Sequence, residues 1–501
     1  MKTSDKYPIY MNIATSLTLQ IVTFTSGLII PNLILKQFGS DVNGLVNSLN
    51  QFLSFITLLE GGLGSVILAT LYEPLIKKDH AKTAKILRSA NKFFFQLGII
   101  FLVYCVGVIF LYLQFVQTDF SAGYTGILGL ILCGNLIVQY YCSITNRLLL
   151  EADQKGYIVY LIQIIVIVTV TIMTIVFIDT VQSIHMIKMI RMLVYLIQPI
   201  CFYLYVKKHY TLPVSAAYDE QVLSQRWNGL VQNIAFFIHS NTDVIILTLF
   251  TDLKSVSVYS VYSMIVIGVR AVIITIKNGF VPVLGNCLAL KDKKRLQYYF
   301  DIYEFIIFNV STVVFGCTAS LITSFVMIYT KGINDINYDQ PVFALLITFA
   351  EFIYCIREPY ISVDYADGKF KETRIGAFAE VAINLFVSLF LVIPYGLLGI
   401  AFGTLLAMVS RLFYHVLYNR NHVVYRSVKY FIKRLFIMAV CYIFFFIITR
   451  IIRYKAMTYI DWFVYAGCMF SIYSIITLVC NLLFDKPGMK KVYDYMKGNR
   501  E

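Results

Sequence analysis

The sequence is poor in charged residues. Only 14% of its 501 residues are Asp, Glu, Lys or Arg, whereas 59% are hydrophobic. A soluble domain carries about 25% charged residues, so this composition cannot supply the water-facing surface of a globule of this size. The shortage of charge excludes a soluble enzyme, a nucleic-acid-binding protein and a disordered chain. It predicts a polytopic membrane protein.

The sequence also lacks the spaced ligands of a metal site. None of the ten cysteines forms a CxxC pair, and the six histidines show no HxxxH or HExxH spacing. Zinc sites and disulfide frameworks need such pairs, whereas these cysteines lie almost entirely within apolar runs, as small buried hydrophobes do. A Walker motif is missing as well. We therefore expect no metal, no cofactor and no catalytic residues.

Long apolar runs fill most of the chain. A helix needs about 20 apolar residues to cross the hydrocarbon core, and about fourteen runs meet this requirement. They predict an all-α polytopic membrane protein with two six-helix lobes at 1–206 and 229–417, a cytoplasmic linker at 207–228, and two additional helices with a basic tail at 418–501. The predicted spans are residues 12–35, 44–71, 93–113, 124–149, 157–178, 186–206, 229–250, 256–281, 303–328, 341–363, 375–393, 396–417, 432–450 and 461–484.

Basic residues are divided unequally between the predicted loops. If the N-terminus is cytoplasmic, thirty of the 42 basic residues fall in inner loops and tails, and six fall in outer loops. Cytoplasmic loops carry an excess of Lys and Arg, so both termini are predicted to lie on the cytoplasmic side. The net charge of +14 is then chiefly a signal of topology.

Short matches recur between the two six-span blocks. Pro74 and Pro282 end the second and eighth spans before lysine-rich runs, 208 residues apart (282 minus 74), and Asp153 and Asp367 follow the fourth and tenth spans, 214 residues apart (367 minus 153). The similar offsets predict a duplication. Six spans per repeat give both lobes one topology, related by an axis along the membrane normal, which suits alternating access around a path between the lobes.

Three stretches mix small, polar and charged residues at the ends of predicted spans. They are FGSDVNG at 38–44 running into FLSFITLLEGGLG at 52–64, REPY at 357–360 leading to ADGKFK at 366–371, and EVAIN at 380–384 before GLLGIAFGT at 396–404. These stretches resemble the Wzx-type polysaccharide repeat-unit flippases of the multidrug/oligosaccharidyl-lipid/polysaccharide exporter (MOP) superfamily. The resemblance implies two six-helix lobes in pseudo-twofold repeat and export of a lipid-pyrophosphate-linked oligosaccharide.

A few ionisable residues lie within the predicted spans, where they are costly unless they pair, face the bundle interior or line a wet path. Arg270 and Lys277 are seven residues apart on one face of the eighth span. The tenth span carries Glu351, Arg357 and Glu358 before Pro359, which is expected to kink it. Glu60 lies in the second span, and Asp243 ends a polar patch in the seventh.

These charges suggest a division of roles. Arg270, Lys277 and Arg357 are candidate substrate-binding residues, because a pyrophosphate needs positive charge and fork-like donors. The candidate ion-coupling residues are Glu60, Asp243, Glu351 and Glu358, holding H+ or Na+. The competing interpretation is structural pairing, for example of Glu60 with Arg270.

The leading hypothesis is a flippase, not an enzyme, that moves undecaprenyl-pyrophosphate-linked oligosaccharide repeat units across the bacterial cytoplasmic membrane by alternating access. A cation-coupled multidrug exporter of the MATE type and a lipid II flippase are the alternatives, and a membrane polysaccharide polymerase is a remote one. The expected partners are the lipid bilayer, the lipid-linked oligosaccharide, and a polysaccharide polymerase and glycosyltransferases. We expect a monomer and no binding of nucleic acid.

Overall fold

The computed structural model describes residues 3–54, 64, 67–68, 70–138, 143–211, 213, 241–452 and 458–497, and every regular element in these ranges is a helix. The predicted all-α class is therefore confirmed. Contacts divide the chain into two compact units, Met1–Ser257 and Val258–Glu501, called unit 1 and unit 2 below. The predicted linker at 207–228 falls largely outside the described residues, and the predicted lobe boundaries stay predictions.

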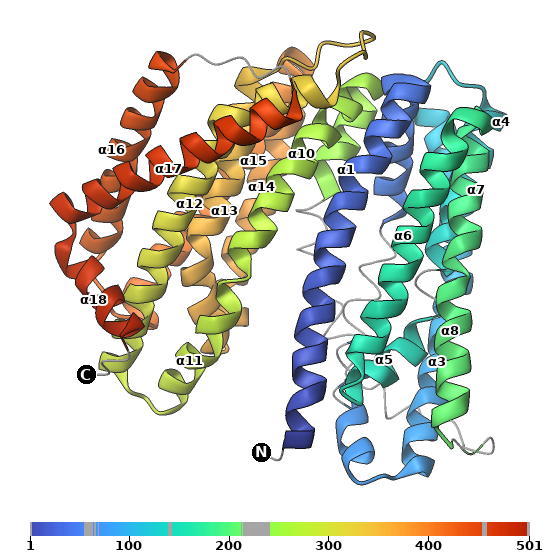
Figure 1. Cartoon of the computed structure of the whole chain (residues 1–501), viewed down its shortest axis with the longest axis horizontal. Coiled ribbons are helices and arrows are strands. Elements are labelled where there is room, and N and C mark those ends of the chain that lie inside the picture. Colours follow the sequence, from blue (N-terminus) through green and yellow to red (C-terminus); the bar gives the residue numbers. More distant parts are fainter. Residues whose placement is uncertain are drawn as a thin grey trace. The chain divides into compact units, whose positions relative to one another are not determined.

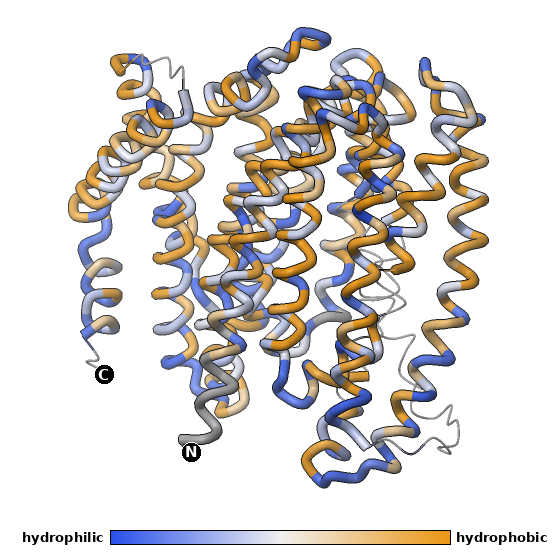
Figure 2. Tube along the Cα trace, turned by 45° about the vertical axis from the view of Figure 1, so that its right-hand side comes forward, coloured by the Kyte–Doolittle hydropathy of each residue, from blue (hydrophilic) through white to orange (hydrophobic). Residues whose placement is uncertain are grey.

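Ten described helices are long and apolar enough to cross a membrane, and two shorter apolar helices occupy Ala122–Leu136 and Asn241–Phe250. Figure 2 shows hydrophobic residues along the middle of the helices and hydrophilic residues mostly at their ends and connections. This pattern is expected of helices that cross a bilayer. Parts of the predicted spans 44–71 and 229–250 lie outside the described residues, so the total of about fourteen spans stays a prediction.

In unit 1 the most extensive helix contacts join elements that are distant in the chain, α1 with α6 and α4 with α7 (Figure 1). The bounds in this unit are Thr3–Leu53 for α1, His80–Phe115 for α3, Ala122–Leu136 for α4, Ile144–Ala152 for α5, Gly156–Val181 for α6, Ile184–Tyr195 for α7 and Ile197–His209 for α8. The helix α10, Leu253–Ile274, begins in unit 1 and ends in unit 2. The predicted spans 93–113 and 157–178 lie within α3 and α6, and the predicted span 186–206 is covered by α7 and α8 together.

The stretch FGSDVNG at 38–44, the first of the three that resemble Wzx-type flippases, contains a break in α1. At 51 residues this element would be about 76 Å long, more than twice the hydrocarbon thickness. Gly39 interrupts it with a φ of 80°, a left-handed conformation that favours glycine. The next glycine, Gly44, has no room for a Cβ because the carbonyl of Leu253 lies against it. Asn43 also donates a hydrogen bond to Ser257 (2.7 Å), so this stretch joins α1 to the start of α10.

Helix α3 has an exposed face that is apolar, as expected of a helix in contact with lipid. Phe94, Phe101 and Cys105 are buried on one face, whereas Phe95 and Val103 are about 70% exposed on the other. An exposed face of a water-soluble helix would be polar. Two apolar faces on one helix, one of them uncovered by protein, are the expected pattern for a helix in contact with lipid.

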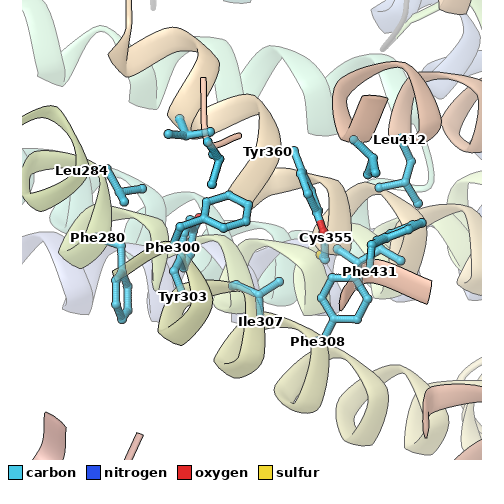
Figure 3. Close-up of a cluster of buried hydrophobic side chains, with 14 of the residues drawn as sticks. Phe280, Leu284, Phe300, Tyr303, Ile307, Phe308, Cys355, Tyr360, Leu412 and Phe431 are labelled. Carbon is cyan, nitrogen blue, oxygen red and sulfur yellow. The ribbon is translucent and has the colours of Figure 1, made fainter. Parts of the chain in front are cut away.

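Unit 2 contains the second half of the helices and a large hydrophobic core. The bounds are Lys277–Ala289 for α11, Lys293–Tyr329 for α12, Pro341–Ala366 for α13, Phe370–Tyr395 for α14, Leu397–His422 for α15, Lys429–Ile451 for α16, Tyr459–Phe484 for α17 and Lys486–Met496 for α18. Figure 3 shows part of the core: Phe280 of α11 lies near Phe300 and Tyr303 of α12, and Leu412 of α15 lies at the other end of the cluster, near Phe431 of α16. The predicted single span 256–281 is divided between α10 and α11.

The predicted repeat is visible in matching turns. Lys78 and Lys291 both have a left-handed φ (54° and 55°). Each precedes an aspartate that caps the next helix: Asp79 accepts a hydrogen bond from the backbone N–H of Lys82, and Asp292 from that of Arg295. These turns are 213 residues apart (292 minus 79), close to the 214 of the other predicted match.

The proline match at 208 residues is not structurally equivalent. In the first turn the carbonyl of Pro74 accepts the hydrogen bond from the N–H of Asp79 (2.9 Å), and in the second the carbonyl of Cys287 accepts that of Asp292 (3.0 Å). Pro282 lies five residues before this position. The register of the repeat therefore follows the capping aspartates and not the prolines.

Ion pairs attach the last helices to α12. Glu304 of α12 is fully buried and accepts hydrogen bonds from Arg426 (2.7 Å) and from Tyr360 of α13. Asp485, between α17 and α18, pairs with Lys433 (2.7 Å) and Arg434 of α16. Buried carboxylates need such partners, and here the partners come from the helices and loops that must be held together.

Candidate functional site

Two ion pairs join α13 to its neighbours, one to α10 and the other to α11, and their partners have the same separation in the sequence. Arg270 contacts both carboxylate oxygens of Glu351 through Nη1 (3.0 and 2.8 Å), and Lys277 contacts Glu358 (3.0 Å). In both pairs the partners are 81 residues apart, because the two cations and the two acids are each seven residues apart. Lys277 is 32% exposed and Arg270 23%. We call these two pairs the rim.

A second set of charges lies deeper, between α13, α14 and α15. Arg357 of α13 and Arg411 of α15 bind the two oxygens of Glu380 of α14, at 2.5 and 2.7 Å. All three side chains are at most 7% exposed. One carboxylate therefore bridges two guanidinium groups and connects three helices.

This set continues along α15 to His415. The Nε–H of Arg411 donates to Nε2 of His415 (3.0 Å), so the ring hydrogen of a neutral His415 is on Nδ1, which donates to Asp364 (2.5 Å). Asn419 donates to the other oxygen of Asp364 (2.9 Å). We call the residues Arg357, Asp364, Glu380, Arg411, His415 and Asn419 the interior cluster.

Tyr354 connects the rim to the interior cluster. The guanidinium carbons of Arg270 and Arg357 both lie over its ring, 4.6 and 4.3 Å from the ring centre. The face of an aromatic ring attracts a cation, so one tyrosine contributes to the placement of both arginines. Across the two regions, four Arg and Lys side chains are matched in number by four carboxyl groups.

The structure places the predicted site residues in several environments. Arg270, Lys277, Glu351 and Glu358 come together in the rim, and Arg357 belongs to the interior cluster. Asp243 is in unit 1, where it is 7% exposed. Glu60 lies outside the described residues. Among the described residues, Arg270 forms its ion pair with Glu351, and the pairing of Arg270 with Glu60 stays a prediction.

Several polar and charged residues of the structure lie outside the predicted site. Arg411, His415 and Asn419 are four residues apart and so lie on one face of α15, a signal that could have identified them. In unit 1, Lys188 is 5% exposed and Arg191 follows one turn later on α7. Among the described residues, neither forms an ion pair with a carboxylate. A buried cation inside a predicted span could also have been recognised.

REPY at 357–360 and GLLGIAFGT at 396–404, which also resemble Wzx-type flippases, have a direct structural role. Each polar side chain of REPY makes a contact described above: Arg357 with Glu380, Glu358 with Lys277, and Tyr360 with Glu304. In GLLGIAFGT, Gly399 and Gly403 have no room for a Cβ against α14. This small-xxx-small spacing lets two helices approach closely within a membrane.

Solved structures with the same fold are membrane transporters. A lipid II flippase MurJ in an inward closed conformation matches with a TM-score of 0.71 and 15% identity, over 95% of this chain and 100% of that one. An inward-facing MATE multidrug transporter of the MOP superfamily gives a TM-score of 0.65 and 12% identity, over 81% of this chain and 97% of its own. The MATE multidrug transporter DinF-BH gives 0.60 and 13%, over 83% and 97%.

At these identities the likeness shows the fold, which is that of MOP transporters. No protein-family model and no curated protein matches this sequence.

Proposed function

We propose that this protein is a flippase that moves an undecaprenyl-pyrophosphate-linked oligosaccharide repeat unit across the cytoplasmic membrane by alternating access. The observation that carries the proposal is the rim. It presents two solvent-accessible cations, Arg270 and Lys277, on one face of consecutive helices in a transporter fold. A pyrophosphate headgroup has the charge and the paired oxygens that these side chains bind.

Binding at the rim proceeds by exchange of anions. Each rim cation is held by a carboxylate when substrate is absent, and a phosphate oxygen takes the place of that carboxylate. The released Glu351 or Glu358 lies in a partly dehydrated site, where an uncompensated negative charge is costly. It therefore takes up H+ or Na+, which couples the ion to the substrate. Asp243 and Glu60 are proposed as further ion-coupling residues in the first half of the chain.

Arg357 has a supporting role in this proposal. It is only 6% exposed and is paired with Glu380, so it stays in place during binding. Because it lies over the same Tyr354 ring as Arg270, it contributes positive potential near the rim. Direct contact with the headgroup falls to Arg270 and Lys277. Arg357 therefore belongs to the binding region although it is buried and paired with Glu380.

The proposal is tested by Arg270→Ala in a strain whose polysaccharide export depends on this protein. Loss of a charge-assisted contact to phosphate is worth about 2–3 kcal/mol, so we expect export to fall by about 100-fold while the abundance of the protein in the membrane is unchanged. The matched control is Arg450→Ala, which removes an exposed arginine from the last turn of α16. Normal export by Arg270→Ala would exclude Arg270 as a substrate ligand.

The alternative substrates share this fold and are separated by reconstitution. Proteoliposomes containing the purified protein would be supplied in turn with a lipid-linked oligosaccharide, with lipid II and with a cationic dye. Translocation of the oligosaccharide that is lost in Arg270→Ala supports the proposal. Translocation of lipid II alone, or of the dye alone, would replace it by the corresponding alternative.

A further inference from the structure

The helix α18 follows directly after a candidate span. The span α17 ends at Phe484, Asp485 is the single residue between them, and α18 runs from Lys486 to Met496. Asp485 is buried and held by Lys433 and Arg434 of α16. The beginning of α18 is therefore fixed within one residue of the end of a membrane helix.

One face of α18 is attached to unit 2. Lys491 forms an ion pair with Asp301 of α12 (2.6 Å), and Tyr495 packs with its ring against Phe280 and Tyr299. Val492 lies against the same core. These contacts determine which side of the helix faces the protein.

The opposite face carries a row of lysines. Lys486, Lys490, Tyr493 and Lys497 follow one another at intervals of four, three and four residues, so they lie on one side of the helix. All four side chains are exposed. The Lys497 ammonium group lies over the ring of Tyr493 (4.4 Å). Among the described residues, no carboxylate forms an ion pair with these three lysines.

We propose that this row, the lysine face of α18, binds the anionic headgroups of phospholipids in the membrane leaflet next to it. The lysines begin within two residues of the end of a span, at the depth where headgroups lie. An exposed tyrosine among lysines is typical of a surface that rests at the membrane interface. Anionic lipid attracts lysines held near the membrane surface, and the face supplies three ammonium groups, none of which forms an ion pair within the described residues.

The lysine face has a consequence for the transporter. Because α18 is fixed to α12 and α16 through Asp301 and Asp485, anionic lipid bound to its outer side steadies the ends of those helices. This proposal is independent of the identity of the transported substrate.

Amide hydrogen exchange of the full-length protein tests the proposal. The protein would be placed in nanodiscs of phosphatidylcholine, or of equal parts phosphatidylcholine and phosphatidylglycerol, and exchange followed over residues 486–497. Each lysine near an anionic surface contributes about fivefold in affinity. We expect slower exchange of α18 in the anionic bilayer, and a loss of that difference in high salt because the attraction is screened.

The variant Lys486→Gln/Lys490→Gln/Lys497→Gln should weaken the interaction by about 100-fold, which is the product of three fivefold terms, and should exchange equally fast in both bilayers. The control Lys291→Gln/Lys293→Gln/Lys294→Gln removes the same charge from exposed lysines elsewhere in unit 2 and should keep the difference. Equal exchange of the wild-type helix in both bilayers would overturn the proposal. A difference that survives in the triple variant of α18 would overturn it as well.

Discussion

The rim and the interior cluster are two charged regions that share helix α13 and differ in their access to solvent. In the rim, the cations Arg270 and Lys277 are 23% and 32% exposed. In the interior cluster, Glu380 and its two arginines are at most 7% exposed, and His415 and Asp364 are fully buried. Opposite charges are paired in both regions. The rim carboxylates Glu351 and Glu358 are 13% and 6% exposed, so the two regions differ chiefly in the exposure of their cations.

This difference follows from the cost of leaving a charge alone. An exposed ion pair is worth about 0–1 kcal/mol because water solvates each partner when they separate. Removing one partner of a buried pair costs about 3–5 kcal/mol because the other charge stays in a medium that cannot solvate it. The rim is therefore suited to binding and the interior cluster to holding α13, α14 and α15 together.

The largest effect is expected from Glu380→Gln, which leaves Arg357 and Arg411 without their shared carboxylate. We expect a loss of about 3–5 kcal/mol in the free energy of unfolding, seen as a lower Tm in detergent and reduced abundance in the membrane. The matched change in the rim, Glu351→Gln, should cost less, because Arg270 is 23% exposed and water solvates part of the charge that loses its partner. Equal losses from the two variants would remove the distinction between the regions.

An intermediate effect is expected from exchanging the charges of one rim pair in Arg270→Glu/Glu351→Arg. The pair can form again in the reversed order, so the Tm should stay close to that of the wild type, whereas Arg270→Glu alone places two carboxylates side by side and should lower it. Export should nevertheless fall by about tenfold or more, because the guanidinium now projects from α13 instead of α10. Full export by the exchanged variant would show that the pair matters only for structure.

The smallest effect is expected from Tyr354→Leu, which removes the ring that Arg270 and Arg357 both contact. The ion pairs of these arginines with Glu351 and Glu380 are kept. Cation–π contacts are worth about 0.5–2 kcal/mol, so export should fall by several-fold with little change in Tm. A double-mutant cycle with Arg270→Ala measures whether the ring acts through Arg270. Additive losses would mean that the rim and the interior cluster function separately.

Much of the fold could be predicted from the apolar runs, and its details could not. The runs located α13 through α17 within about five residues, because a helix in lipid must be apolar over about 20 residues. Helix α12 begins at Lys293, ten residues before its predicted span. The continuous run at 256–281 gave no sign of the division between α10 and α11. The amphipathic helix α18 was missed because a row of lysines beside a packed face has no long apolar run.

Most charged residues of the candidate site could be predicted from the sequence, but the residues with which they form ion pairs could not. Charges at positions 270, 277, 351, 357 and 358 could be recognised because each is expensive within a span. Their seven-residue spacing gave the shared faces, but no spacing indicates which helix those faces meet. Glu380 and Arg411 therefore remained outside the predicted site, although one carboxylate joins them to Arg357.

The sequence by itself determined that this chain is an all-helical membrane protein with a few charges in its spans, because transfer of apolar and charged groups into lipid depends on composition and run length alone. The resemblance to MOP transporters could also be drawn from short stretches of residues. Only the tertiary structure decided which charges pair, which of them solvent reaches, and which face of α18 is left open. Those properties depend on neighbours tens of residues away in the chain, whose approach is set by the packing of helices and by glycines such as Gly44 and Gly403.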